Sequence, residues 1–396
     1  MPESPPSTSL SVGFVGCGGF MRGNHLPNIA RIPGFRIRAL CDLDAALLAK
    51  IAATYRPDYT TSDYRRVFAD PEIRVVISGT GPNFRLPLIE AAAASGKALF
   101  VEKPMSLGWE DTRRILEILA VRPVPVMVGM NRRYSEIMRE TKRIFDARRL
   151  GPTLINYRIV GEDLLWPEFH REQLRRGAST LVHEIVHIFD LLNWLVGERP
   201  DSIYAVGPPS DNHILVLTWP GDARAAITSG GCGTEGFPKE CLEIFTNNTA
   251  IRAQDFVELN VAQAPGERDR LFPLKSNPRG PCEGYTEARL REDLRAWRAQ
   301  LTQEQIAVGY YYDSRVCVDK GHFAEMLCLH ECLSRAQPIP TDAICGAEAV
   351  FLALKAQESL ETGLPIRLDW MRLMPFSSSA RRFLERSREP LLAGAA

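Results

Sequence analysis

Two histidines and a glutamate stand at a spacing that zinc enzymes use. Residues 180–192 read TLVHEIVHIFDLL and contain His183-Glu184-Ile185-Val186-His187, which is an HExxH match. On a helix this spacing places both imidazoles on one face, where they can bind zinc while the glutamate serves as a general base. A polar stripe on a buried helix can equally line another kind of enzyme cleft, so the spacing alone leaves both chemistries open.

The same helix offers no third zinc ligand at a suitable place. Asp190 and Asn193 occupy the positions where a metzincin continuation needs glycine and histidine. Glu198 lies roughly 16 Å along the axis from His187, at 1.5 Å per residue. We therefore predict no bound metal and keep a zinc metalloprotease as the less favoured alternative. Asp190 is expected to orient His187 from one turn away or to cap nearby backbone.

Size and composition predict a globular protein of two domains. The chain has 396 residues, 45% of them hydrophobic, and Lys+Arg 48 balance Asp+Glu 48. Because no net charge supplies a basic footprint, we expect no nucleic acid partner. No apolar run approaches the roughly 20 residues that span a bilayer. Nine cysteines without a CxxC pair suit reduced thiols. These features predict a cytoplasmic protein without a membrane partner.

The first third of the chain alternates between strand-like and helix-like segments. The strand-like runs are 12–15, 35–42, 73–80, 97–104 and 125–130, and the helix-like runs between them are 24–32, 44–55, 86–96 and 109–120. This alternation predicts a parallel sheet with helices on both faces, as in a dinucleotide-binding Rossmann domain.

Glycines and an acid in this region have the order of a dinucleotide site. Gly16-Cys17-Gly18-Gly19 follows the first strand, and Phe20 and Met21 come next, with Met21 in place of the third glycine of GxGxxG. Asp42 ends the second strand and can bond both ribose hydroxyls. Because its carboxylate would repel a 2'-phosphate, we expect NAD, with NADP possible. Ligands bind beyond the carboxyl ends of such strands, where we also expect Thr80-Gly81-Pro82-Asn83 and Glu102-Lys103-Pro104.

Several motifs together resemble the glucose-fructose oxidoreductase and inositol 2-dehydrogenase family, often called Gfo/Idh/MocA. They are GCGGF, KALFVEKPMS, MVGMNRRYS and a glycine-led helix with a histidine, and they run in order over most of the chain. The resemblance implies an NAD(P)-dependent oxidoreductase that moves hydride to or from a carbon of a sugar, sugar nucleotide or cyclitol. It also implies an α/β chain whose second, α+β domain has a large, mostly antiparallel open sheet that pairs subunits as a homodimer or homotetramer.

The resemblance further implies roles for single residues. Lys103 matches the lysine at the reacting hydroxyl, and His187 matches the catalytic histidine. His183 stands where the family usually has an acid, and Glu184 matches an acidic position of a sugar-modification branch, so either can assist His187. This departure leaves open a nucleotide-binding regulatory protein without turnover. Arg132 is expected at the cofactor, and the substrate is expected to contact Arg133, Tyr157, Trp166, His170 and Arg175. Residue type supports this, because arginine binds carboxylate or phosphate in a fork and an aromatic face suits a sugar ring. Arg132 and Arg133 can instead pair with acids, and Trp166 can instead be a packing residue.

The predicted domain layout has four parts. Residues 1–10 form a disordered leader, 11–131 the Rossmann domain, 132–375 the substrate-binding and oligomerisation domain, and 376–396 a C-terminal helix or tail. An Arg-rich insertion covers about 265–315. In the second domain, β-rich runs at 202–207, 213–219, 223–229, 241–247 and 250–256 alternate with turn signals and predict an antiparallel sheet. An apolar exposed face on that sheet would favour a dimer.

Overall fold

The computed structural model describes residues 9–161, 179–208, 210–234, 237–272 and 316–370, together with isolated positions between 273 and 315. The chain divides into two compact units. Unit 1 contains the described residues of Met1–Met130, His322–Val350 and Trp370–Ala396, and unit 2 contains those of Asn131–Gly321 and Phe351–Asp369. Residues 322–350 therefore group with unit 1, although the sequence analysis assigned all of 132–375 to one domain.

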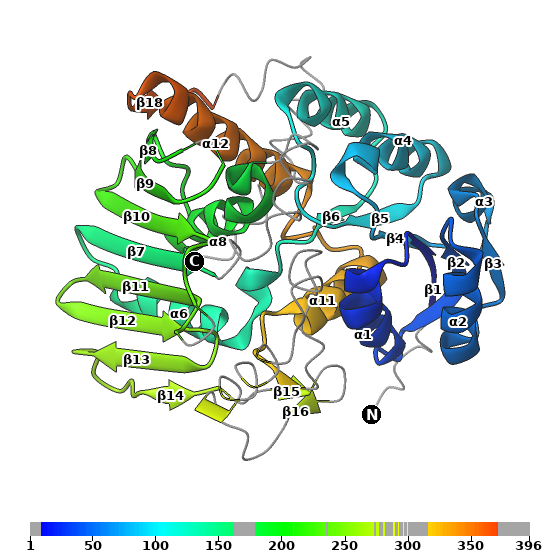
Figure 1. Cartoon of the computed structure of the whole chain (residues 1–396), viewed down its shortest axis with the longest axis horizontal. Coiled ribbons are helices and arrows are strands. Elements are labelled where there is room, and N and C mark those ends of the chain that lie inside the picture. The colour runs from blue at the N-terminus through cyan, green and yellow to red at the C-terminus, as the bar shows by residue number, and fades with distance from the viewer. Residues whose placement is uncertain are drawn as a thin grey trace. The chain divides into compact units, whose positions relative to one another are not determined.

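Unit 1 is built on a six-stranded parallel sheet with the strand order β3-β2-β1-β4-β5-β6 (Figure 1). Its strands are β1 Leu10–Val15, β2 Phe35–Cys41, β3 Tyr59–Thr61, β4 Val75–Ser78, β5 Ala98–Val101 and β6 Val126–Val128. Every residue of β4 and β5 is buried, which agrees with their continuous apolar sequences and with a sheet covered on both faces. The strand order reverses between β1 and β4, which is where such sheets bind nucleotides.

Helices of unit 1 connect these strands. They are η1 Met21–His25, α1 Leu26–Ala30, α2 Ala45–Tyr55, α3 Tyr64–Ala69, η2 Pro82–Phe84, α4 Arg85–Ser95 and α5 Trp109–Val121. A later helix, α11 His322–Ser334, returns to pack against η1 and α1. His330 of α11 fits over Gly34, where an added Cβ would lie 1.8 Å from the His330 ring nitrogen. The return of α11 explains why residues far along the chain belong to unit 1.

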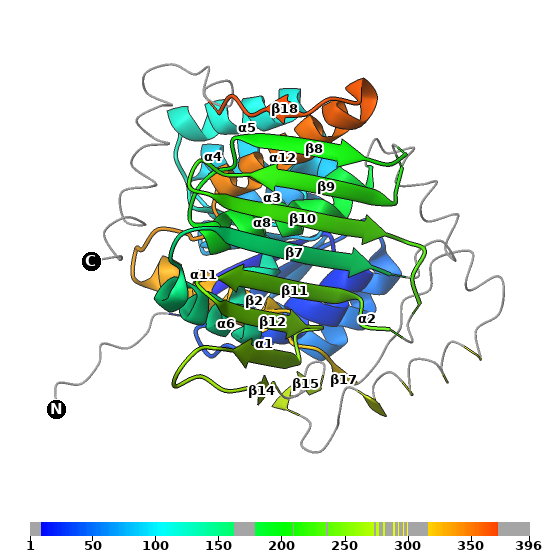
Figure 2. The same ribbon diagram turned by 90° about the vertical axis from the view of Figure 1, so that its left-hand side faces the viewer.

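Unit 2 is built on a nine-stranded sheet with the order β14-β13-β12-β11-β7-β10-β9-β8-β18 (Figure 2). Its strands are β7 Thr153–Val160, β8 Ser202–Val206, β9 His213–Thr218, β10 Ala223–Gly230, β11 Glu240–Thr246, β12 Thr249–Gln254, β13 Glu258–Ala262, β14 Arg270–Leu271 and β18 Ile366–Arg367. The pair β7–β10 is parallel and the other pairs are antiparallel. A separate small sheet pairs β15 Lys275–Ser276 with β16 Gly280–Pro281 and β17 Val316–Cys317.

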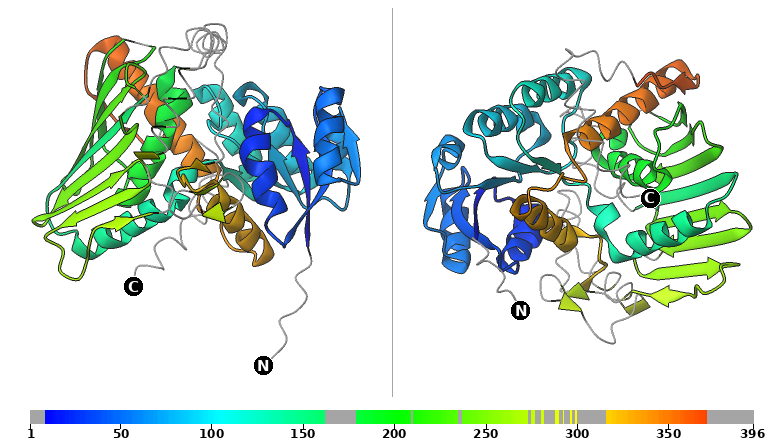
Figure 3. Two further views of the ribbon diagram at one scale, coloured as in Figure 1. Left: turned by 60° about the horizontal axis from the view of Figure 1, so that its bottom comes forward. Right: turned by 180° about the vertical axis from the view of Figure 1, so that it is seen from behind.

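Within the described part of the chain, helices cover one face of the large sheet and not the other. In Figures 2 and 3 the described helices of unit 2 lie on the same side of the sheet. They are η3 Asn131–Tyr134, α6 Glu136–Arg148, η5 Leu181–Ile185 and α8 Val186–Val196, while α12 Ala343–Thr362 is shared by both units. Buried and exposed residues alternate along β7, β9 and β12, as expected when a strand packs on one side only.

The predicted fold class is confirmed: a parallel Rossmann sheet is joined to a second unit with a mostly antiparallel sheet. Helix α12 ends at Thr362, where Gly363 follows with a left-handed φ of +69°. Elements α3, α6 and β3 were not among the predicted ones. Among the described residues, no helix is both long enough and apolar enough to cross a membrane.

Candidate functional site

The glycine turn after β1 forms a bare backbone cradle in unit 1. Gly16 has a φ of +80°, and a Cβ added there would lie 2.9 Å from the Thr80 backbone nitrogen. A Cβ on Gly79 would lie 2.7 Å from the Gly16 carbonyl oxygen. Glycine is therefore needed where the loops after β1 and β4 approach each other. Gly18 and Gly19 face open space instead, so their backbone can be approached by a phosphate.

Asp42 is fixed at the end of β2 beside this turn. Its Oδ2 accepts a hydrogen bond of 2.7 Å from the Cys17 backbone N–H, and its Oδ1 accepts one of 3.0 Å from the Asp44 N–H. Each carboxylate oxygen has a second lone pair, and the side chain is partly exposed, so Asp42 can still accept from two ribose hydroxyls. Burial and the nearby Asp42 charge raise the pKa of the Cys17 thiol to about 12, which keeps this sulfur neutral.

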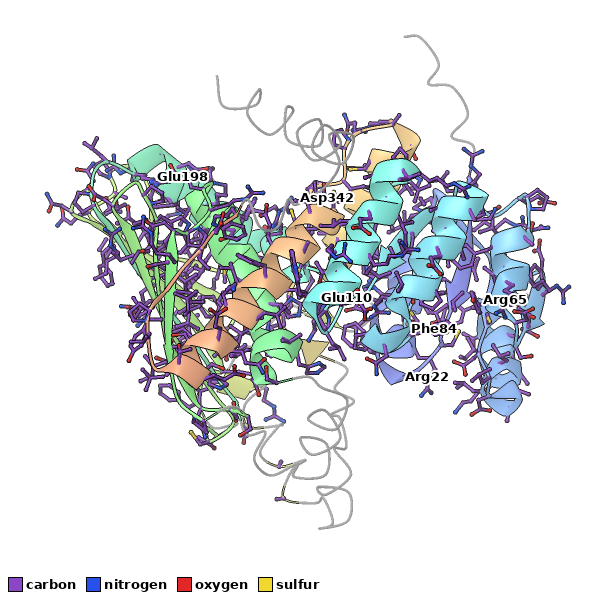
Figure 4. All side chains as sticks on the ribbon, turned by 90° about the horizontal axis from the view of Figure 1, so that it is seen from above. Arg22, Arg65, Phe84, Glu110, Glu198 and Asp342 are labelled. Atoms are coloured by element: carbon purple, nitrogen blue, oxygen red, sulfur yellow. The ribbon has the colours of Figure 1, made fainter. Side chains whose placement is uncertain are left out.

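The remaining predicted residues of the cofactor rim differ in exposure. Phe20, Gly81 and Asn83 are exposed, Thr80, Pro82 and Lys103 are partly exposed, and Met21 and Cys17 are buried. In Figure 4 the side chains of Arg22, from η1, and Phe84, from η2, lie at the same margin of unit 1. An exposed cradle of glycines flanked by Asp42 fits an extended dinucleotide, and these residues belong to the stretches that the sequence analysis predicted.

Glu102, which was predicted at the cofactor, is held by a histidine that the sequence analysis did not select. His25 Nε2 and Glu102 Oε1 form a hydrogen bond, and the His25 ring is fully buried. Burial alone would raise the pKa of Glu102, but the His25 hydrogen bond and the charges of His25, His322 and Lys103 outweigh it and lower the pKa. The sequence signal was a lone histidine in the otherwise mostly apolar segment HLPNIA.

Arg85 is a second buried group at this rim that the sequence analysis did not select. Its side chain is 2% exposed, and Nη1 donates to Thr80 Oγ1 at 3.1 Å and to Ser78 Oγ at 3.4 Å. Burial lowers the pKa of Arg85 to about 10, against the favourable charge of Glu102. The guanidinium therefore remains charged at neutral pH and fixes the Thr80 hydroxyl beside the glycine turn.

Unit 2 contains a buried ion-pair network centred on Glu240 of β11. Arg132 donates to both of its carboxylate oxygens, from Nε at 2.8 Å and from Nη2 at 3.0 Å. Lys320 Nζ donates to Oε1 at 2.8 Å, and Tyr157 Oη donates to Oε2 at 2.7 Å. Burial opposes ionisation of Glu240, but the charges of Arg132 and Lys320 prevail and hold its pKa far below the usual range. Arg132 Nη2 also donates to Glu184 Oε1 at 3.0 Å.

These contacts show where two predicted ligand-binding residues lie in unit 2. Arg132, expected at the cofactor, binds two carboxylates, and Tyr157, expected at the substrate, is 1% exposed with its hydroxyl on Glu240. Pairing of Arg132 with acids was the open alternative, and Arg132 has that pairing in the structure. The sequence could have indicated that Glu240 is buried, because it alternates with Leu242 and Ile244 on the inward face of β11.

Arg133 and Asp190 form a second buried pair, which corrects the expected role of Asp190. Arg133 Nε donates to Asp190 Oδ2 at 2.9 Å, and its Nη2 donates to Oδ1. The Asp190 carboxylate was expected to orient His187 or to cap backbone. It is bound instead by a guanidinium, because a bidentate arginine satisfies a buried carboxylate better than one imidazole nitrogen. Arg133 was expected at the substrate and makes this ion pair.

The HExxH residues lie where a π-helical turn meets an α-helix. Leu181–Ile185 is π-helical and carries His183 and Glu184, and α8 begins at Val186 and carries His187, which is 5% exposed. Such π-helical turns occur often at functional sites. Glu184, the general base of a zinc mechanism, accepts from Arg132 instead. Within the described ranges, no three His, Cys, Asp or Glu side chains are grouped to hold a metal ion. Trp166, His170 and Arg175 lie outside the described residues.

The strand order, the glycine cradle and Asp42 together define unit 1 as a dinucleotide-binding domain of the Rossmann class. Comparison with known proteins agrees. Residues 10–130 match the family model described as an oxidoreductase family with an NAD-binding Rossmann fold, Gfo/Idh/MocA. The matched region thus belongs to the Gfo/Idh/MocA family and the chain is an NAD-binding oxidoreductase, which agrees with the resemblance of its motifs.

Sequence similarity to known proteins extends beyond the Rossmann domain. An uncharacterized oxidoreductase, YrbE, of Bacillus subtilis (strain 168) is 24% identical over 379 residues, or 93% of this chain and 99% of the relative. An inositol 2-dehydrogenase of Rhizobium meliloti (strain 1021) is 26% identical over 250 residues, or 60% of this chain and 74% of the relative. The crystal structure of an Agrobacterium radiobacter oxidoreductase with NAD+, L-tartaric acid and magnesium has a TM-score of 0.70 at 18% identity, and the match covers 92% of this chain and all of the other, which shows a shared fold.

Proposed function

We propose that this protein is an NAD-dependent dehydrogenase of a neutral cyclitol or sugar, with Lys103 and His187 at the reacting hydroxyl. The inositol 2-dehydrogenase relative supports the substrate class. The observation that favours a neutral substrate is the pairing of charges in unit 2. Arg132, Arg133 and Lys320 are matched by Glu184, Asp190 and Glu240. These cations already have carboxylate partners, so they are poor candidates for binding an acidic substrate.

The proposed mechanism divides the work between two side chains. When bound, NAD supplies the nicotinamide carbon that accepts hydride from the substrate carbon. His187 takes the hydroxyl proton, and the Lys103 ammonium stabilises the negative charge that develops on the same oxygen. Lys103 belongs to unit 1 and His187 to unit 2. His183 or Glu184 is proposed to assist His187 by holding its ring or a second hydroxyl.

A panel assay tests the proposed activity directly. The protein is mixed with NAD and separately with inositol isomers, neutral sugars and sugar acids, and absorbance at 340 nm is followed. We expect NADH to form with a neutral polyol and at least tenfold faster than with the matching acid. Tight NAD binding without turnover on any polyol would instead favour the regulatory alternative, and faster turnover of sugar acids would contradict the neutral substrate.

The position of Asp42 predicts a preference for NAD over NADP. Replacing Asp42 with Asn removes the charge while keeping an oxygen that can accept from the Cys17 N–H. We expect the ratio of kcat/KM for NAD to that for NADP to fall by about 10- to 100-fold, equivalent to about 1.4–2.8 kcal/mol of lost discrimination. Steady-state kinetics with both cofactors measures the ratio. The same change at the exposed Asp111 of α5 should leave the ratio unaltered.

The helix-free face of the nine-stranded sheet is proposed to pair two copies of the chain, in a homodimer or homotetramer. Large apolar side chains of four strands are exposed on it, namely Leu154 (53%), Val206 (51%), Ile214 (57%), Val216 (40%) and Phe245 (42%). Val206 lies directly opposite Ile214 in the β8–β9 register, and Leu154 lies opposite Phe245 in the β7–β11 register. Exposed apolar patches of this kind commonly mark contacts between proteins.

Light scattering after size exclusion tests this pairing. We expect the wild-type mass to be two or four times that of one chain and the Ile214→Arg mass to be one chain, because a charge would be buried in the interface. Val121→Arg, a control at a still more exposed apolar residue of α5, should keep the wild-type mass. A wild-type protein with the mass of one chain would contradict the proposal.

A cytoplasmic location is part of the same proposal. The described cysteines Cys17, Cys41, Cys232, Cys241, Cys328, Cys332 and Cys345 are free thiols. Free thiols persist in reducing compartments, whereas secreted proteins commonly form disulfides.

A further inference from the structure

The structure assigns His25 a role as a positioning residue for Lys103, through the carboxylate of Glu102. This inference rests on the proposed role of Lys103 in hydride transfer. His25 lies on η1, the helical turn that follows the glycine cradle, and Lys103 follows the end of β5. The Glu102 carboxylate contacts both His25 and the Lys103 backbone, so His25 can fix the position of Lys103 through it.

The Glu102 carboxylate is bound on two sides and packed on a third. Oε1 accepts from His25 Nε2, and Oε2 accepts a hydrogen bond of 3.3 Å from the Lys103 backbone N–H. An added Cβ on Gly129, just after β6, would lie 3.1 Å from Oε2. The carboxylate is thus confined between η1, the end of β5 and the end of β6. A shift of Glu102 would therefore move the backbone from which Lys103 extends.

The His25 ring cannot turn away from this contact without repacking its neighbours. It is 0% exposed and meets Phe100 edge to face at 4.9 Å, Phe20 at 5.5 Å and His322 at 6.2 Å between ring centroids. Its Nδ1 has no hydrogen-bond partner among the described residues, so Nε2 is the ring atom that makes the contact. Because the Glu102 carboxylate is an acceptor, Nε2–H donates to it.

The surroundings of Glu102 keep its carboxylate ionised. Burial would raise the pKa of Glu102, but the His25 hydrogen bond and the charge of His25 lower it most, and His322 and Lys103 lower it further. His25 also has a directional role, because a hydrogen bond fixes the position of an oxygen whereas distant charges only favour its ionisation.

Two replacements separate this role from simple packing. His25→Gln places an amide N–H near the position of Nε2 and can still donate to Glu102, whereas His25→Leu fills the space without a donor. We expect His25→Leu to lower kcat by about 10- to 100-fold, the effect of a small misplacement of a reacting group. His25→Gln should stay within about threefold of wild type. The NADH Kd, measured by fluorescence titration, should change less than about threefold in both.

The control is His330→Gln on α11, whose ring contacts Phe35 at 4.9 Å and Ser334 instead of Glu102. It should leave kcat unchanged. The inference is overturned if His25→Leu keeps full kcat, if His25→Gln falls as far as His25→Leu, or if the NADH Kd rises in proportion to the loss. Failure of the proposed function is recognised separately, because Lys103→Met would then remain active whatever the His25 variants do.

A measurement on the protein without cofactor gives an independent result. With ¹⁵N-labelled histidine, the seven histidines of the chain give few enough signals for His25 to be assigned through His25→Gln. We expect its proton on Nε2 and a strongly downfield N–H resonance that moves upfield in Glu102→Gln, where the acceptor loses its charge. A proton on Nδ1 alone, or a resonance that does not change in Glu102→Gln, would overturn the inference.

Discussion

Lys103→Met is expected to lower kcat by about 10³-fold, because a preorganised cation that stabilises a developing alkoxide contributes effects of this order. Methionine keeps the length of the side chain and removes its charge. The NADH Kd should stay within about threefold, since the glycine cradle and Asp42 are untouched. Single-turnover absorbance at 340 nm measures the chemical step, and fluorescence titration measures cofactor affinity.

Lys50→Met serves as the matched control for this experiment. Lys50 is exposed on α2, so the same loss of charge should change neither kcat nor the NADH Kd. Unaltered turnover of Lys103→Met would refute the role of Lys103. A parallel loss of cofactor affinity would show that the lysine binds the cofactor instead of acting on the substrate oxygen.

Glu240→Gln should lower the free energy of unfolding by about 3 kcal/mol or more, because it leaves two cations without their buried carboxylate. Arg132 and Lys320 both donate to Glu240, whose side chain is 2% exposed. Urea denaturation followed by tryptophan fluorescence measures the difference. The matched change Glu258→Gln affects a surface pair with Arg252 at 3.4 Å and should cost less than about 0.5 kcal/mol.

The stability difference between wild type and Glu240→Gln should also depend on pH. The pKa of Glu240 is lower in the folded protein than in the unfolded chain, so its contribution to stability is fully present above the unfolded value of about 4.3. As pH falls below that value, the unfolded chain takes up the proton first and the contribution shrinks. A difference that stays constant from pH 6 to pH 3 would contradict this assignment.

The cofactor half of the site could be predicted from the sequence because its signals are local. Gly16, Gly18 and Asp42 follow strands whose apolar runs are recognisable, and all parallel strands present their carboxyl ends at one edge. The contacts that organise the rest join distant positions. His25 and Glu102 are 77 residues apart, and Arg132 and Glu240 are 108 apart. Periodicity describes which face of an element is buried, and it contains no information about the partner on another element.

The same limit explains the expectations for Arg132, Arg133 and Asp190. Residue type alone indicates that an arginine in a cleft can bind a ligand or an acid, and the outcome depends on whether a carboxylate folds against it. Glu240 and Asp190 reach the two arginines from β11 and α8. An acid on the inward face of a strand, as at Glu240, is the pattern that would have indicated a buried cation as its partner.

The return of α11 to unit 1 has a consequence for how the protein is made. Synthesis proceeds from the N-terminus, so β1 to β6 leave the ribosome long before the helix that packs on η1 and α1. Until α11 has been synthesised, the surface around Gly34 that His330 covers is exposed. All of the unit 2 strands except β18 are synthesised in that interval. Unit 1 is therefore the first unit to start folding, and it can complete its packing only after α11 has been synthesised.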